Sequence, residues 1–258
     1  MLLIFGLDLT YTQLLLRGDT LSEVEYHTVD TLVTKRSTRE PLAYITRERW
    51  FYGRRFVVSP DVLIPRHETE LLVQHATAYL KACRASKPLV LDLCTGSGCV
   101  GISIACEYQN AVVWCTDISS DAVAIAIENI ELHECTNRME CVVGDLDGGC
   151  ADLAFFDVIV ANPPYIAHDE INTLAVEVRD WEPEIALYAN DNGLELYPRI
   201  AGIAKRRLVP GGWISAECGQ SQASKIKCIF EDAGLTDVCI HADLAGIPRV
   251  VSGRQNEE

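Results

Sequence analysis

The chain has 258 residues, of which 48% are hydrophobic, and it carries a formal net charge of −15 at pH 7. A chain of this length holds one large domain or a core domain with a small appendage, and its composition excludes a disordered protein. The longest apolar runs fall far short of the ~18 residues of a membrane span, and the acidic balance disfavours broad nucleic-acid binding.

The cysteines and histidines indicate the cellular setting of the protein. Its eleven cysteines are an odd number, and many stand inside apolar, strand-like runs, which favours buried free thiols over disulfides. No CxxC pair occurs, and the six histidines do not fall at metal-ligand spacings, so no metal site is predicted. We therefore expect a reducing, cytoplasmic location, with no membrane anchor and no stable nucleic-acid partner.

The first 43 residues predict a small helical domain. Ser22 and Glu25 form a capping-box pattern that starts one of its helices. Over residues 44–64, aromatic and β-branched residues around Gly53 predict a β-hairpin that links this small domain to the rest of the chain.

Residues 35–55 are rich in Lys and Arg although the whole chain is acidic. This local charge fits a solvated helix end followed by a hairpin. It also fits a docking surface for an anionic macromolecule, and the sequence leaves both interpretations open.

From residue 65 onwards the sequence predicts the main domain. Pro65 opens a helix with apolar residues at helical spacing, and another helix is expected over residues 193–208. The expected strands cover residues 88–94, 111–117, 139–145, 156–162, 211–218, 237–243 and 248–253. This alternation is typical of a doubly wound, mostly parallel α/β sheet of the Rossmann-like type. The short link between the last two strands predicts one antiparallel strand.

Polar groups stand at the ends of the first strands, where open α/β sheets bind their ligands. The first strand ends in a D-L-C-T-G-S-G turn, residues 92–98, whose glycines permit a tight bend before a helix N-terminus. Asp117 ends the second strand, where a carboxylate can accept both hydroxyls of a ribose, and Asp145 ends the third, where an acid can accept an adenine amine. A single acid of this kind is often only a helix cap, but the set indicates a cofactor site.

The fourth strand stops abruptly at Asn162, Pro163, Pro164 and Tyr165. Proline has no backbone N–H and fixes φ, so the strand cannot continue and the turn is rigid. We expect this turn to hold the Asn162 amide, the Pro163 carbonyl and the Tyr165 ring in fixed positions. Such an arrangement suits a planar nitrogen that presents N–H donors, either a side-chain amide or an exocyclic amine.

These motifs resemble the release-factor glutamine methyltransferase family, the HemK/PrmC type of class I S-adenosylmethionine-dependent methyltransferases. The resemblance covers residues 40–253 and is carried by LIPR-x-ETE at 63–70, NPPY at 162–165 and the glycine turn. It implies N5 methylation of the glutamine in the GGQ motif of class I release factors. The family usually has a longer helical N-terminal domain, so residues 1–43 look shortened, and residues 65–258 would be the methyltransferase domain.

The resemblance also implies roles for individual residues. Asn162, Pro163 and Tyr165 would be catalytic, because the Asn162 oxygen and the Pro163 carbonyl pair the two N–H groups of the substrate amide. Substrate would contact Asn162, Pro163, Pro164, Tyr165 and Arg66. S-adenosylmethionine would bind at Cys94, Thr95, Gly96, Ser97, Gly98, Asp117, Asp145, Leu146 and Asn162. For Arg66, an ordinary helix-start ion pair with Glu70 is an equally good interpretation.

Other functions fit parts of the sequence. An N6-adenine or N4-cytosine nucleic-acid methyltransferase would use the same NPPY geometry, but the acidic chain shows no basic recognition domain. Gly96, Gly98 and Gly101 match the dinucleotide fingerprint of a nicotinamide-dependent oxidoreductase, which leaves Asp145 and NPPY unexplained. A non-catalytic binding module is disfavoured because all four strand-end groups are intact.

Overall fold

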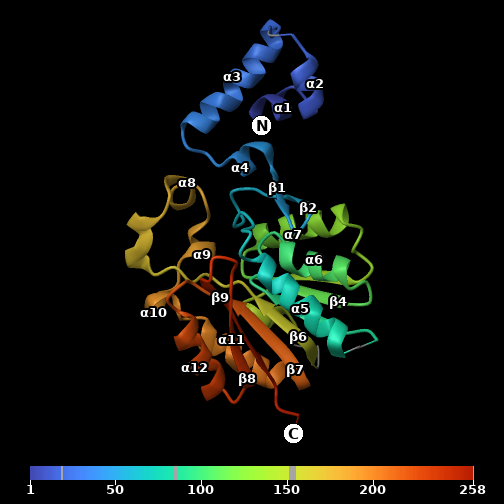
Figure 1. The fold of residues 1–258 in the computed structure, drawn as a ribbon, viewed down its shortest axis with the longest axis vertical. Coiled ribbons are helices and arrows are strands. Elements are labelled where there is room, and N and C mark those ends of the chain that lie inside the picture. The colour runs from blue at the N-terminus through green and yellow to red at the C-terminus, as the bar shows by residue number, and fades with distance from the viewer. Residues whose placement is uncertain (19, 84–85, 151–154, 258) are drawn as a thin grey trace.

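The centre of the molecule is a sheet of seven strands (Figure 1). The computed structural model describes residues 1–18, 20–83, 86–150 and 155–257. In chain order the strands of the sheet are β3 (Leu89–Leu93), β4 (Val112–Asp117), β5 (Met139–Val143), β6 (Phe156–Ala161), β7 (Leu208–Glu217), β8 (Thr236–Ala242) and β9 (Pro248–Arg254). Their spatial order is β5-β4-β3-β6-β7-β9-β8, and β9 runs antiparallel to both of its neighbours while the other pairs are parallel. The predicted sheet with one antiparallel strand is confirmed.

Helices cover both faces of this sheet. One face carries α5 (Glu70–Cys83), α6 (Cys99–Glu107) and α7 (Ser120–Leu132), and the other carries α11 (Tyr197–Arg207) and α12 (Ala223–Asp232). In β3, Val90 packs with the first group and Leu91 with the second, because neighbouring side chains of a strand point to opposite faces. Both faces are therefore buried, so polar side chains concentrate at the strand ends.

Four described helices and a hairpin precede α5 and the sheet. These elements are α1 (Leu2–Gly6), α2 (Tyr11–Leu16), α3 (Glu23–Ser37), α4 (Leu42–Thr46), β1 (Glu48–Phe51) and β2 (Arg54–Val57). Ser22 and Glu25 form the predicted capping box of α3, whereas α4 was not expected. No residue of α1, α2 or α3 is buried, and Figure 1 shows these helices standing apart from the sheet. Among the described helices, none combines the length and apolar character needed to cross a membrane.

Two helices begin later than the sequence predicts. α5 begins at Glu70 and not at Pro65, because the preceding residues form consecutive turns in which each N–H donates three residues back, from Thr69 to Arg66 for example. α11 begins at Tyr197 and not at residue 193. The residues before it form a separate short helix, α10 (Asn190–Gly193), in which Asp191 and Asn192 have positive φ and break the helical path.

The polar segment between β6 and α11 is folded. It contains a 3-10 helix (His168–Thr173), α8 (Val176–Arg179), α9 (Glu184–Leu187) and α10. Glu177 of α8 forms ion pairs with Arg36 and Arg39, at 3.0 and 2.7 Å. These pairs connect the end of α3 to the segment that frames the strand ends.

Most of the basic side chains in segment 35–55 also form ion pairs. Besides Arg36 and Arg39, three of its arginines lie near acidic side chains. These pairs are Arg47 with Glu128, Arg54 with Glu107 and Arg55 with Glu48. The chain itself thus neutralises much of this charge, which favours an ordinary protein surface over a docking surface for an anionic macromolecule.

Candidate active site

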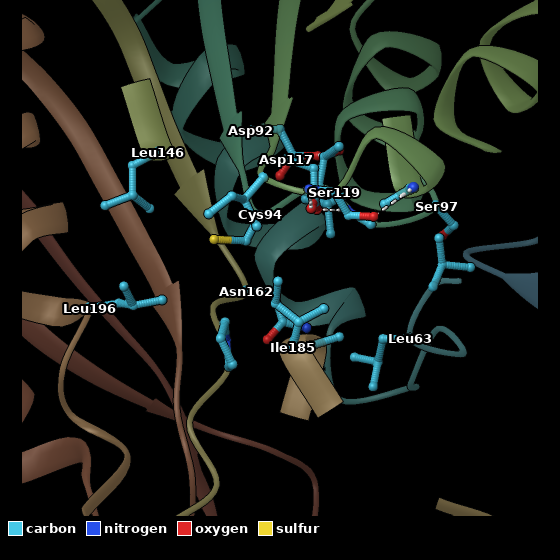
Figure 2. Close-up of a pocket in the computed structure, with 18 of the residues that line it drawn as sticks. Leu63, Asp92, Cys94, Ser97, Asp117, Ser119, Leu146, Asn162, Ile185 and Leu196 are labelled. Carbon is cyan, nitrogen blue, oxygen red and sulfur yellow. Dashed lines mark hydrogen bonds between the residues drawn. The ribbon is translucent and has the colours of Figure 1, made fainter. Parts of the chain in front are cut away.

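A cavity of about 300 Å³ lies at the carboxyl ends of four neighbouring strands. Residues after β3, β4, β5 and β6 all line it, so the structure brings the predicted strand ends together. The remaining wall comes from Asp61, Val62, Leu63, Pro65, Thr69, Ile185, Ala186, Tyr188, Ala189, Glu195, Leu196 and Arg199. In Figure 2, Asp92, Asp117 and Ser119 lie together at one end, while Asn162, Ile185 and Leu63 lie at the other. Within the described ranges, no three metal-ligating side chains lie together.

The turn after β3 is built around the buried carboxylate of Asp92. Its Oδ2 accepts hydrogen bonds from the Thr95 hydroxyl at 2.6 Å and the Gly101 N–H at 2.9 Å, and burial raises the pKa of this carboxyl to about 7. Gly96 has a φ of +54°, and a Cβ at this position would meet open space. A ligand can therefore approach the backbone of this turn closely. Cys94 lines the same cavity and also has a positive φ, +56°.

Both oxygens of Asp117 are held by the backbone. Oδ2 accepts from the Gly96 N–H at 2.9 Å and Oδ1 accepts from the Ser119 N–H at 3.0 Å. Burial raises the pKa of this carboxyl, and the two hydrogen bonds oppose that rise. Each carboxylate oxygen has a second lone pair, so Asp117 can still accept from a diol in the cavity.

Asp145 and Leu146 line the cavity beyond β5. The Oδ2 atom of Asp145 accepts a hydrogen bond from Arg199 of α11 at 2.8 Å. Leu146 is buried, with a φ of +53°. An adenine amine at this position would share the Asp145 carboxylate with Arg199, a partner that no sequence motif indicates.

The NPPY turn after β6 sends its side chains in different directions. Asn162 and Pro164 line the cavity, and the Asn162 Nδ2 donates to the Thr69 hydroxyl at 3.3 Å. Pro163 is buried. Tyr165 lies outside the described lining of the cavity; its hydroxyl donates to Glu217 Oε1 at 3.1 Å. Only part of the motif therefore faces the cavity directly.

Arg66 pairs with Glu182 and not with Glu70. Its Nη2 donates to one Glu182 oxygen at 2.5 Å, and the other oxygen accepts from the Ile64 N–H at 3.2 Å. Glu70 accepts from the Tyr52 N–H at 2.9 Å. Glu182 is buried, and it joins the LIPR segment to the chain before α9. Arg66 thus holds two walls of the cavity together.

Three buried polar residues to which the sequence motifs assign no role also shape the site: Asn129, Thr69 and Glu217. Asn129 of α7 donates to the Val57 and Ser97 carbonyls, both at 2.9 Å, and accepts from the Val57 N–H at 2.7 Å. It ties the hairpin to the glycine turn. For Asn129 and Glu217, the sequence signal was a polar residue on the buried side of an otherwise apolar helix or strand.

Comparison with known proteins places this geometry in a family. The PrmC N-terminal domain model matches residues 1–46, and the Methyltransferase small domain model matches residues 67–178. The chain is 39% identical to a bifunctional methyltransferase of Rickettsia typhi, covering 91% of this chain and 48% of the relative. It thus spans about half the length of the Rickettsia relatives it matches.

Two further similarities extend over most of both proteins compared. A solved methyltransferase from Pyrococcus furiosus, 16% identical, shares the fold with a TM-score of 0.57 over 90% of this chain and 98% of that chain. The release factor glutamine methyltransferase of Geobacter sulfurreducens is 40% identical over 223 residues, which are 86% of this chain and 76% of that protein. On this similarity, the chain belongs to the release factor glutamine methyltransferase family of the HemK/PrmC type.

Proposed function

We propose that this chain methylates the N5 nitrogen of the glutamine in the GGQ motif of class I peptide chain release factors, using S-adenosylmethionine, in support of translation termination. The observation that carries the proposal is a single cavity with an amide side chain, Asn162, at one end and the partly buried carboxylate of Asp117 at the other. Membership of the family supports the choice of substrate.

The residues present fit the cofactor. When bound, S-adenosylmethionine supplies an electrophilic methyl group on a positively charged sulfur. Gly96 leaves open space beside the backbone, and Asp117 keeps lone pairs for the ribose hydroxyls. Asp145 accepts the adenine amine. The other residues assigned to cofactor binding are Cys94, Thr95, Ser97, Gly98, Leu146 and Asn162.

The NPPY turn acts on the substrate amide. A glutamine nitrogen is a poor nucleophile because its lone pair is delocalised into the carbonyl. The Asn162 Nδ2 is bound to Thr69, and among the described residues none donates to its Oδ1, so this oxygen can accept a substrate N–H. The Pro163 carbonyl accepts the second N–H of the substrate amide. Positioning of this kind can lower the activation barrier by roughly 7 to 11 kcal/mol. No side-chain base is needed, because the substrate nitrogen would carry a positive charge directly after it accepts the methyl group and would then release its proton readily.

The proposal also gives each part of the chain a role. Residues 1–43 dock the release factor, and residues 44–64 form the hairpin that links them to the main domain. Residues 65–258 form the domain that transfers the methyl group. Exposed apolar side chains on α1–α3 support docking, and these are Leu3, Phe5, Tyr11, Leu15, Leu16, Val24, Tyr26 and Val33. All eleven cysteines are free, which supports a cytoplasmic location.

A transfer assay tests the proposal. With labelled S-adenosylmethionine, purified protein should label a class I release factor, and a factor whose GGQ glutamine is replaced should stay unlabelled. Asn162→Ala should lower the rate by ~100-fold or more, because an acceptor for the substrate amide is lost, while cofactor affinity stays within about threefold. Asn137→Ala is the matched control, since this asparagine is exposed and outside the cavity lining.

Two outcomes would replace the proposal. Labelled DNA or RNA beside unlabelled factor would show an exocyclic amine to be the acceptor. Thermal stabilisation by NADH, with none from S-adenosylmethionine, would point to an oxidoreductase.

A further inference from the structure

A buried carboxyl group stands behind the NPPY turn, at the end of β7. Glu217 is 2% exposed, and its Oε1 accepts from the Tyr165 hydroxyl at 3.1 Å. Its Oε2 is also buried, and within the described chain no donor reaches it in good hydrogen-bond geometry. Burying a carboxyl group lowers the stability of the fold unless neighbouring groups form hydrogen bonds with it.

The groups that face Glu217 come from several elements. Burial raises the pKa of Glu217 to about 7, and the hydroxyls of Thr69 and Tyr165 oppose this rise. Among charged side chains, Glu68 adds to the rise and Arg249 of β9 opposes it, while Arg249 is itself paired with Asp243 at 3.0 Å. The titratable groups Cys99, Tyr197 and Cys218 also lie within electrostatic range. Thr69 is thus a hydroxyl donor that lies close to this carboxyl group.

Thr69 connects this carboxylate to Asn162. A hydroxyl group has one hydrogen, and the Thr69 oxygen already accepts from the Asn162 Nδ2 at 3.3 Å. Its hydrogen is therefore available to Glu217, which as a carboxylate can only accept. The chain of donors then runs in one direction, from Asn162 to Thr69 to Glu217. In that direction the Asn162 amide must turn its nitrogen to Thr69 and its oxygen to the cavity.

We infer that Glu217 is a positioning residue, which through Thr69 fixes the Asn162 side-chain oxygen toward the substrate and through Tyr165 fixes the last residue of the motif. The inference rests on the proposed function and deepens it. Glu217 does not line the cavity, so it acts only through these two neighbours.

The protonation state of Glu217 decides the direction of this network. A protonated carboxyl can donate to Thr69, and the Thr69 hydrogen then turns toward Asn162. The Asn162 amide would rotate to accept it, and its NH₂ group would face the substrate. Two donors would then meet, so the substrate amide would lose its acceptor.

The pH profile of transfer to a release factor tests this inference. In the wild type, kcat at saturating S-adenosylmethionine should fall below about pH 7, because carboxyl groups donate once protonated. Glu217→Gln should lose that acid limb, and at pH 8 its kcat should be about tenfold below the wild type. A Glu217→Gln profile that matches the wild type, in both shape and height, would overturn the inference.

Variants of Thr69 give an independent test. Thr69→Val keeps the shape and removes the hydroxyl, so kcat should fall at least about tenfold, whereas Thr69→Ser should stay within about threefold. Equal losses in both variants would assign Thr69 a packing role and contradict the network. Cofactor binding by each variant shows that it is folded. An inactive wild type would contradict the proposed function instead, so the two failures are distinguishable.

Discussion

Cys94 occupies a backbone conformation that suits glycine. Its φ of +56° lies in the left-handed region, which costs a residue with a Cβ roughly 1–2 kcal/mol. We expect Cys94→Gly to be more stable than Cys94→Ala by about 1 kcal/mol, which reverses the usual order, because only glycine relieves this strain. Urea unfolding measures the difference.

A second cysteine provides the control for this comparison. Cys106 lies within α6, where alanine should be the more stable replacement by about 1 kcal/mol. If alanine is favoured at both positions, the backbone at Cys94 is not strained.

Asp117 has two tasks at the cofactor end. It faces the cavity, and it also holds the Gly96 N–H at 2.9 Å, so removing it affects both the ribose site and the glycine turn. Asp117→Ala should weaken S-adenosylmethionine binding at least tenfold, or about 1.4 kcal/mol, measured by titration calorimetry. The exposed Asp121, in the first turn of α7, is the control and should leave affinity unchanged when replaced by Ala. Unchanged binding in Asp117→Ala would place the ribose elsewhere.

At the scale of elements, Asn129 joins α7, the hairpin and the glycine turn by three hydrogen bonds. Asn129→Ala should lower the free energy of unfolding by roughly 3 kcal/mol, because it leaves partly buried backbone groups of Val57 and the buried carbonyl of Ser97 without this partner. Glu128→Ala, one residue earlier, removes only an exposed ion pair with Arg47 and should cost less than about 1 kcal/mol. Equal stability of the two variants would contradict this role for Asn129.

Elements were predictable where a local pattern decides them. The strands, the capping box of α3 and the hairpin around Gly53 all follow from composition and spacing within a few residues. The predicted start of α11 was wrong because Asp191 and Asn192 have positive φ, and that of α5 was wrong because a distant partner decides it. Glu182 holds Ile64 and Arg66 away from a helical path, and this carboxylate lies over a hundred residues along the chain.

At the scale of the whole molecule, Glu217 links stability to pH. Its pKa is raised from 4.5 to about 7, so the folded protein holds this proton at a pH where the unfolded chain has lost it. Unfolding then releases a proton, and stability falls as pH rises. The side chain of the Glu217→Gln variant does not ionise. From pH 5 to pH 8, we therefore expect its free energy of unfolding to rise by roughly 3 kcal/mol relative to that of the wild type.

Urea midpoints of the two proteins across this pH range measure the effect. A constant difference between them would show that Glu217 titrates normally in the folded protein. If the difference grows as expected, the same ionisation that orients Asn162 also lowers the stability of the fold.

The candidate site, like the secondary-structure elements, was predictable only where a local pattern decides the position of a residue. Asp117, Asp145 and Asn162 could be placed at one edge of the sheet because parallel strands bring their carboxyl ends together. The position of Tyr165 beside Glu217, and of Arg199 beside Asp145, depends on side-chain packing between elements that are distant in sequence. No local pattern encodes such contacts.

The late start of α5 has a consequence for how this chain can change in evolution. Thr69 lies just before the helix, and Leu72, three residues on, is fully buried in the core. One residue inserted between them would rotate Thr69 by about 100° around the helix axis, away from Asn162, while Leu72 stayed in the core. Between these two residues, related chains should therefore differ in side chains but not in length.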